Sequence, residues 1–215
     1  MDRIICITVF ALVFLFVASP LYAIAQVYAI AQDPLKTLQQ NIESGISVLE
    51  DPRYQDTSRK QEQLKILYEI MLETYDLRLF SRQVLGRHWH RFSQSQKNEF
   101  VKVFSEFLGK YYLGQLQKRY SGQRVNYLRQ QIIGNSRAMV EIEVVWRKLK
   151  IPVTLHLSNR TGKWKVYNLS FLGISAVRNY RAQFNWILKR ESPQQAIARI
   201  KNKIAKLDKK SQLES

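Results

Sequence analysis

Cysteine is almost absent from this chain of 215 residues. The single cysteine, Cys6, lies inside an apolar block at the N-terminus. One thiol cannot form an intramolecular disulfide, and Cys6 comes too early in the block to be the modified cysteine of a lipoprotein. Once that block is removed, zinc thiolate sites and cysteine nucleophiles are excluded as well. Glycine and proline are also scarce, with 8 and 5 residues, which excludes collagen-like and linker-rich architectures.

Acidic residues are half as frequent as basic ones. The chain has 17 Asp and Glu against 34 Lys and Arg, and its formal net charge is +17. Such a charge favours an acidic neighbour, which could be nucleic acid, anionic lipid or an acidic protein. The basic residues are scattered, so a solvated basic surface is the simplest interpretation. Hydrophobic residues make up 46% of the chain, which predicts a packed core and excludes a disordered charged tail.

The N-terminus has the layout of a secretory signal peptide. Residues 4–19 are apolar, Pro20 ends the block, and the small-residue motifs Ala23-Ile24-Ala25 and Ala29-Ile30-Ala31 follow. We expect residues 1–25 to be the signal, with cleavage after Ala25 or Ala31. A membrane anchor is the alternative, but the block is shorter than the about 20 residues that a span needs. Export argues against a nucleic-acid partner and leaves transient contact with a membrane surface open.

Helix signals occupy the two ends of the remaining chain. Asp33-Pro34 and Asp76 are predicted helix starts, and Ser58 with Gln61 and Ser93 with Gln96 have the capping-box pattern. Later helices are expected at about 174–189 and from Ser192-Pro193 to about Lys206. The longest predicted helix, about 94–119, carries one apolar stripe, formed by Phe100, Phe104, Phe107, Leu108, Tyr111 and Leu116.

From about 124 the apolar period changes from 3.6 to 2, which indicates strands. Four runs with short connections, one of them the Asn159–Gly162 turn, predict an antiparallel sheet. The order of helices, strands and helices predicts one α+β domain over 33–207, followed by a polar tail at 208–215. Its architecture would be helices packed on a twisted, roughly four-stranded antiparallel sheet that encloses an apolar pocket.

The chain lacks the usual catalytic motifs. It has no P-loop, no G-x-G-x-x-G and no G-x-S-x-G. His88 and His90 have no obvious third metal-ligand partner, and Glu141 and Glu143 are best explained as balancing basic residues on neighbouring strands. We therefore expect no enzymatic activity, no cofactor and no metal site. Large apolar side chains are abundant, and composition alone does not separate an ordinary core from a ligand cavity.

Two motifs carry a resemblance to a known family. The first is V-L-G-R-H-W-H-R-F-S at 84–93, followed by Q-K-N-E-F at 96–100. The second is G-K-W-K-V-Y-N at 162–168, with G-I-S at 173–175 and N-Y-R-A-Q-F at 179–184. Together they resemble the MlaC family of periplasmic phospholipid-binding proteins, auxiliary components of a toluene-tolerance ABC transporter. The resemblance covers about 35–205. The chain departs from it at Asn168, where the family usually has an acidic residue, and at Leu172, where it often has Glu.

The resemblance implies a periplasmic carrier that holds phospholipid acyl chains in an internal pocket and maintains lipid asymmetry. The implied partners are an outer-membrane lipoprotein complex and the substrate-binding ring of an inner-membrane ABC transporter. Arg87 and Arg178 are expected at the pocket mouth. A hopanoid-like cargo, or a basic envelope interaction protein without internal ligand, remains as an alternative. From strand and helix faces and the matched motifs, the expected lipid-binding residues are Val84, Leu85, Trp89, Phe104, Leu108, Tyr111, Tyr127, Ile142, Val144, Trp146, Val153, Leu155, Val166 and Ile174.

Overall fold

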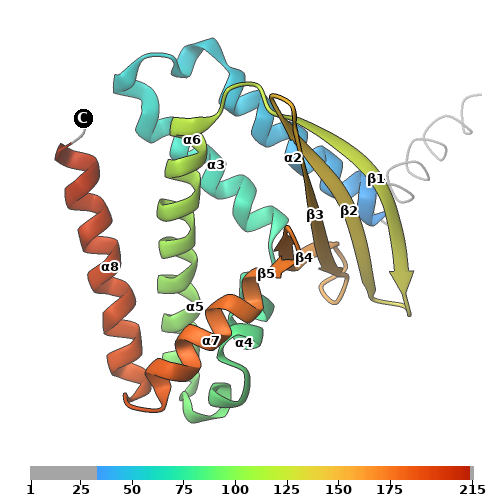
Figure 1. The fold of residues 1–215 in the computed structure, drawn as a ribbon. Helices are drawn as coiled ribbons and strands as arrows, with labels where there is room; N and C mark the ends of the chain where they lie inside the picture. Colours follow the sequence, from blue (N-terminus) through green and yellow to red (C-terminus); the bar gives the residue numbers. More distant parts are fainter. Residues whose placement is uncertain (1–32, 214–215) are drawn as a thin grey trace, which may run out of the picture.

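The computed structural model describes residues 33–213 and places a helical half beside a sheet half (Figure 1). The predicted signal peptide lies outside the described residues. The helices are α2 Pro34–Glu50, α3 Lys60–Thr74, α4 Leu77–Leu85, α5 Gln94–Leu108, α6 Gly114–Arg119, α7 Ala176–Leu188 and α8 Pro193–Leu213. The strands are β1 Arg124–Ile133, β2 Arg137–Trp146, β3 Leu149–Ser158, β4 Lys165–Phe171 and β5 Ile174–Ser175.

The sheet is an antiparallel meander in the order β1-β2-β3-β4-β5, which confirms the α+β class. It has five strands and not about four, because Ile174 and Ser175 form a short strand that pairs with the end of β4. Two residues are too few to show a period of 2, and the helix expected from about 174 begins at Ala176 instead. The predicted turn at Asn159–Gly162 is confirmed by a hydrogen bond from the Gly162 N–H to the Asn159 carbonyl oxygen.

Side-chain caps fix most of the helix starts. Asp33 accepts hydrogen bonds at the start of α2 and Asp76 at the start of α4, and Ser93 with Gln96 forms the predicted capping box of α5. The capping box predicted at Ser58 is wrong. The Ser58 N–H donates to the Asp56 carboxylate at 2.9 Å, and the chain passes through the 3-10 turn η2 Thr57–Arg59 before α3 begins.

The predicted helix over 94–119 is continuous but not uniform. Between α5 and α6 it contains the π-helical turn η4 Gly109–Leu113. Gly109 lies against Tyr68 of α3, and a Cβ at position 109 would overlap the Tyr68 ring. The extra residue of the π turn breaks the apolar stripe expected from the sequence. Its first part is buried in the helical half, whereas Tyr111 and Leu116 are exposed.

The buried side chains form two hydrophobic clusters. One lies among α4, α5, α7, α8 and the 3-10 segment η3 Gly86–Arg91, and the other lies between the sheet and α2. Tyr75 packs against both clusters, and its backbone forms a parallel bridge with Val166 of β4. The Asp76 N–H also donates to the Val166 carbonyl oxygen, at 2.9 Å. The link between α3 and α4 therefore extends the sheet and joins the two halves.

The last helix is longer than the sequence predicts. Helix α8 runs to Leu213, past the expected end near Lys206, and includes most of the segment expected to be a polar tail. It packs on α5 through Ile197 and Ile200, which are fully buried or nearly so. Lys201 pairs with Glu99 at 2.6 Å and Asp208 with Lys110 at 2.7 Å, so its polar face is also tied to α5 and η4.

Candidate functional site

One face of the sheet is apolar along β2 and β3. On β2 and β3 the inward positions pair across the strands, Val140 with Leu155 and Ile142 with Val153. Leu38 of α2 is buried against them, and Leu35 and Ile42 of the same helix pack at its sides. The spacing of these three residues puts them on one helical face, which explains why α2 lies on the sheet. We call this surface the apolar sheet face.

Cover over the apolar sheet face decreases from one end to the other. On β2 the exposed fraction rises from 1% at Ala138 to 37% at Trp146, and on β3 from 1% at Leu157 to 59% at Leu149. On β4, which runs beside β3, Phe171 is 45% exposed whereas Val166 is fully buried. Because all three strands open toward the β2–β3 hairpin, the face is closed at one end and accessible at the other.

Large apolar side chains gather at the open end. Trp146 and Leu149 face each other across the β2–β3 hairpin, and Leu172 and Ile174 extend from the β4–β5 turn. The Trp146 indole N–H donates to the Ser121 hydroxyl at 3.2 Å, which ties the hairpin to the end of α6. Exposed apolar groups of this size on a charged protein indicate a binding surface.

Tyr127 brings a polar atom under α2. Its side chain packs on the apolar sheet face, and its hydroxyl is buried without a hydrogen-bond partner among the described residues. Burial raises the pKa of the Tyr127 phenol to about 12, with a further contribution from the Glu43 carboxylate. A buried hydroxyl without a hydrogen-bond partner costs about 1–3 kcal/mol of stability. A ligand that brings a hydrogen-bond acceptor to this hydroxyl would remove that cost.

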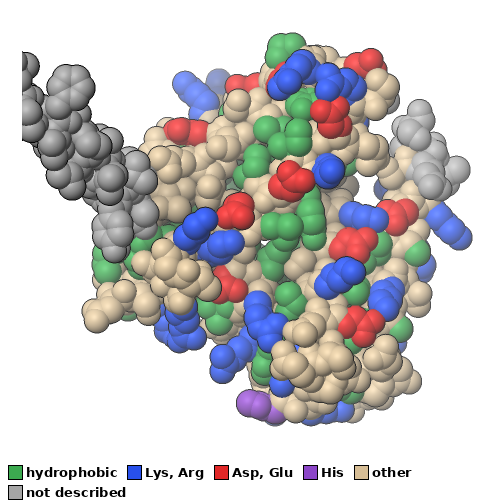
Figure 2. Space-filling view, turned by 180° about the vertical axis from the view of Figure 1, so that it is seen from behind, with side chains coloured by type: hydrophobic (Ala, Val, Ile, Leu, Met, Phe, Trp, Pro, Cys, Tyr) green, Lys and Arg blue, Asp and Glu red, His purple; other side chains and the backbone are tan. Residues whose placement is uncertain are grey.

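A cavity of about 640 Å³ lies where the two halves meet. It is bordered by Tyr68, Leu72 and Tyr75 near the end of α3, by Val101 of α5 and by Lys165 of β4. Figure 2, seen from behind, shows a band of hydrophobic side chains along the middle of the molecule with charged groups on either side. Burial raises the pKa of Tyr75 to about 12, as expected of a phenol at the junction of two cores.

The comparisons with known proteins agree with this geometry. Residues 39–202 match the family described as MlaC protein. The chain belongs to the MlaC family. This confirms the resemblance seen in the sequence motifs. The chain is also 24% identical, over 166 residues, to the intermembrane phospholipid transport system binding protein MlaC of Haemophilus influenzae, an alignment that covers 74% of this chain and 72% of that protein.

A solved structure shares the fold. The phospholipid-binding protein from Ralstonia solanacearum, determined in complex with a phospholipid, superposes with a TM-score of 0.69 at 18% sequence identity. The match covers 83% of this chain and 98% of that protein. At this identity the likeness establishes the fold alone, and the bound phospholipid is a property of the Ralstonia protein.

The first MlaC motif holds the helical half together. Gly86 ends α4 with a φ of +51°, a conformation that favours glycine. Arg181 lies beside it and donates to the Gln83 carbonyl oxygen at 2.7 Å, so it caps the end of α4. His88 is buried, with its Nε2 2.9 Å from the Asn185 side-chain oxygen and its Nδ1 3.2 Å from Arg91. These motif residues are structural in this geometry.

The expected lipid-binding residues fall into three groups. Seven share the apolar sheet face: Tyr127, Ile142, Val144, Trp146, Val153, Leu155 and Val166. Five lie in the helical cluster, packed among Phe80, Phe100 and Phe184: Val84, Leu85, Trp89, Phe104 and Leu108. Two are exposed: Tyr111, stacked on Phe107, and Ile174 at the β4–β5 turn. The structure brings the first seven together and keeps the helical five in the other cluster.

Arg87 and Arg178, the two residues expected at the pocket mouth, make local contacts, and their place at a mouth stays a prediction. Arg87 donates to the Asn185 side-chain oxygen at 3.1 Å, beside His88. Arg178 is exposed in the first turn of α7, and its backbone N–H donates to the Ser175 hydroxyl at 3.2 Å. Glu141 and Glu143 do pair with basic residues on neighbouring strands as expected, with Arg129 at 2.9 Å and Lys150 at 3.6 Å.

Sequence reasoning missed the contribution of α2. Leu35, Leu38 and Ile42 had not been named as site residues, although their helical spacing was visible beside the Asp33 cap. Leu149, which continues the alternation of β3, and Phe171 were also missed; Phe171 reaches the same face as Val166 only through the register shift at His156 and Leu157. For Leu149 the signal was the same period that identified Leu155, extended to the strand end, whereas the irregularity of β4 gave no such signal for Phe171.

Proposed function

We propose that this chain is a lipid carrier that binds phospholipid by its acyl chains on the apolar sheet face and passes it between membrane complexes. The observation that supports it is the gradient of cover along β2, β3 and β4, which leaves one end of an apolar surface accessible. Membership of the MlaC family and the phospholipid bound by the structurally similar Ralstonia protein support the same cargo. The expected lipid-binding residues on this face are proposed as its contacts.

The apolar sheet face would reduce the main energetic cost for such a carrier, which is the exposure of acyl chains to water. Transferring one CH₂ group out of water is worth about 0.8 kcal/mol, so an acyl chain of about 16 carbons resists exposure by roughly 12 kcal/mol. A carrier must therefore cover the chain throughout its passage. The headgroup keeps its hydration if it stays outside, which allows several headgroups to share one site. Release requires a partner that offers another apolar site directly.

The Tyr127 hydroxyl is proposed as the polar contact inside the site. It is a hydrogen-bond donor buried beneath α2 with no acceptor among the described residues. The ester carbonyls of a phospholipid lie between its headgroup and its chains, and either carbonyl could accept this hydrogen bond. Such a contact would fix the depth at which the chains enter the apolar sheet face.

Export and partners belong to the same proposal. The signal-peptide layout of the sequence supports a periplasmic location, and within residues 33–213 no helix is long and apolar enough to cross a bilayer. Family membership supports docking to an outer-membrane lipoprotein complex and to the substrate-binding ring of an inner-membrane ABC transporter, with maintenance of lipid asymmetry as the outcome. The chemistry of this role is binding and transfer, without an enzymatic step.

Lipid extraction from the purified protein, followed by mass spectrometry, tests the cargo. We expect co-purifying phospholipid, whereas a hopanoid or an empty protein in repeated preparations would contradict the proposal. Two adjacent variants test the site. Val144→Glu places a charge on the apolar sheet face and should lower lipid occupancy about tenfold, because a buried carboxylate is costly there.

The matched control is Val145→Glu, one residue further along β2. Val145 points to the opposite face, where its cross-strand neighbours are Arg124 and Lys150, so a carboxylate is accommodated. Circular dichroism of both variants checks that the fold is kept. Equal lipid loss in the two variants would show that the apolar sheet face has no special role.

A further inference from the structure

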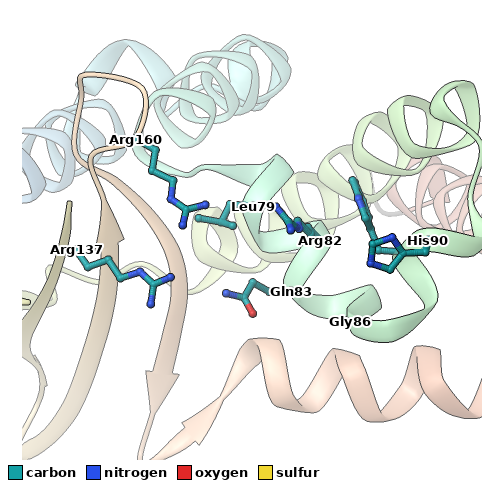
Figure 3. Close-up of a pocket in the computed structure, with 8 residues that line it drawn as sticks. Leu79, Arg82, Gln83, Gly86, His90, Arg137 and Arg160 are labelled. Atoms are coloured by element: carbon teal, nitrogen blue, oxygen red, sulfur yellow. The ribbon is translucent and has the colours of Figure 1, made fainter. Parts of the chain in front are cut away.

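A pocket of about 320 Å³ lies between the sheet and α4, away from the apolar sheet face. Its border includes Arg82 of α4, Arg137 of β2 and Arg160 of the β3–β4 loop. Figure 3 shows the guanidinium groups of Arg137 and Arg160 pointing from the sheet side toward Arg82. Arg137 directly precedes the buried Ala138, so the strand alternation turns it to the opposite face of the sheet from the proposed lipid site.

The three arginines differ from many others in this protein because they have no anionic partner. Arg53, Arg129 and Arg199 each pair with a carboxylate. Among residues 33–213, no ion pair or hydrogen bond engages the side chains of Arg82, Arg137 or Arg160, and no Asp or Glu lines the pocket. Like charges that converge without a counter-ion repel each other, so a bound anion would be favoured there.

The remaining polar lining adds donors. Gln83 accepts a hydrogen bond from Arg181 through its side-chain oxygen, at 3.2 Å, which orients the amide. Its amide nitrogen therefore points the other way, and in Figure 3 it is directed toward Arg137. His90 and Trp89 complete the border on the η3 side. The pocket thus offers several N–H donors from three separate elements, while its one amide acceptor is already engaged.

We propose that this pocket binds a phosphate group. Guanidinium groups recognise phosphate oxygens through paired N–H donors, and three of them match a tetrahedral dianion or a phosphodiester better than a single carboxylate. The phosphate could belong to a lipid headgroup at a membrane surface or be free in solution. The proposal goes beyond the carrier function and does not depend on it, because its residues are separate from the apolar sheet face.

Calorimetric titration with inorganic phosphate, and co-sedimentation with vesicles, test the proposal on the whole purified protein. Vesicles of phosphatidylcholine are compared with vesicles that contain phosphatidylglycerol. The pocket variant is Arg82→Gln, Arg137→Gln, Arg160→Gln, and all three positions are exposed, so the fold should be kept. The single variant Arg160→Gln, in the loop, provides a milder test. The control Lys36→Gln, Lys65→Gln, Lys209→Gln removes the same charge from exposed helix positions elsewhere.

We expect the pocket variant to bind phosphate at least about tenfold more weakly, because it loses the charge-assisted hydrogen bonds of three guanidinium groups. The control should stay within about twofold, since exposed isolated charges contribute little. Binding of inorganic phosphate would identify the free anion, and binding only of phosphatidylglycerol vesicles would identify a lipid headgroup. Binding of neither, or equal weakening in the pocket variant and the control, would overturn the proposal.

Discussion

The side-chain oxygen of Asn168 on β4 accepts a hydrogen bond from the hydroxyl of Ser175, 3.0 Å away, at the N-cap of α7. The same oxygen accepts the backbone N–H of Val177 at 3.2 Å. A strand residue therefore completes the cap of a helix that follows it in sequence. The position matters because the MlaC resemblance predicts an acidic residue there, and a carboxylate would keep both hydrogen bonds.

We expect Asn168→Asp to stabilise the protein at pH 7 by about 0.3–1 kcal/mol, because a negative charge is favoured at a helix N-terminus. The interaction lowers the folded-state pKa of the new carboxyl, so the gain should be present above the unfolded pKa near 4 and disappear as the pH falls below it. Urea unfolding at pH 7 and pH 3 measures it. Asn168→Ala, which removes both hydrogen bonds, should lose about 1 kcal/mol. An Asp variant less stable than the natural chain at pH 7 would contradict this account.

Gly109→Ala should destabilise the protein by about 1–3 kcal/mol, because the added methyl group would overlap the Tyr68 ring in a closely packed region. The control is Gly114→Ala, five residues later in the same continuous helix, where nothing lies within 4 Å of the new Cβ. That change should stabilise by about 0.5–1 kcal/mol through helix propensity. Thermal and urea unfolding compare the two. Adding Tyr68→Leu should recover part of the Gly109→Ala loss, and complete additivity would show that the two residues are independent.

Alkaline pH should weaken the fold through Tyr75. Burial raises the pKa of the Tyr75 phenol to about 12, whereas in the unfolded chain it ionises near 10. The unfolded state therefore loses its proton first, and stability falls as the pH rises from about 10 to 12. A shift of two pKa units corresponds to about 3 kcal/mol. The loss of stability should stay below this value, because Tyr75 borders the 640 Å³ cavity and solvent there can stabilise the ionised phenol. Denaturant unfolding between pH 8 and 12 measures the effect, and the free energy of unfolding of Tyr75→Phe should decline less steeply with pH than that of the natural chain.

The control is Tyr111→Phe, at an exposed tyrosine. If the free energy of unfolding declined equally with pH in all three proteins, the assignment to Tyr75 would be refuted.

Tyr127→Phe should separate the ligand-free protein from the lipid-loaded one. Without lipid, removing an unpaired buried hydroxyl should leave stability unchanged or raise it by about 1 kcal/mol. With lipid, the variant should gain less in Tm than the natural chain, because the proposed hydrogen bond to an ester carbonyl is missing. Differential scanning calorimetry of delipidated and reloaded protein measures both. Tyr167→Phe is the control, since its ring lies beside His156 on the other face of the sheet. An equal gain for Tyr127→Phe and the natural chain would exclude this contact.

Local signals in the sequence predicted most of the secondary structure. Asp33, Asp76 and Ser93 were identified as caps because their side chains act within one turn of the chain. The β2 and β3 strands followed from alternation that continues over ten residues. The β5 strand was too short to show a period, and the π turn depends on the packing of Gly109 against Tyr68, which lies in another helix.

The site was predicted only in part, for a physical reason. An apolar stripe shows that a helix face is buried, but not which surface buries it. Phe104 and Leu108 were therefore grouped with Val144 and Leu155, whereas the structure assigns them to different clusters. The arginine pocket had no sequence signal, because it depends on tertiary contacts. Arg137 and Arg160 are brought close by the pairing of β2 with β3, in which Arg137 lies opposite Ser158, and Arg82 comes from a helix that follows the α3–α4 link to β4.

The decrease in cover along the apolar sheet face also affects which lengths of acyl chain the protein could bind. Ala138 and Leu157 are covered at one end of the apolar sheet face, whereas Trp146 and Leu149 are exposed at the other end. A surface that is covered at one end and exposed at the other limits how far a chain can enter, but it does not limit the total length of the chain. Under the proposed function, an acyl tail longer than the covered stretch would emerge beside the hairpin, so one carrier would accept the range of chain lengths that a membrane contains.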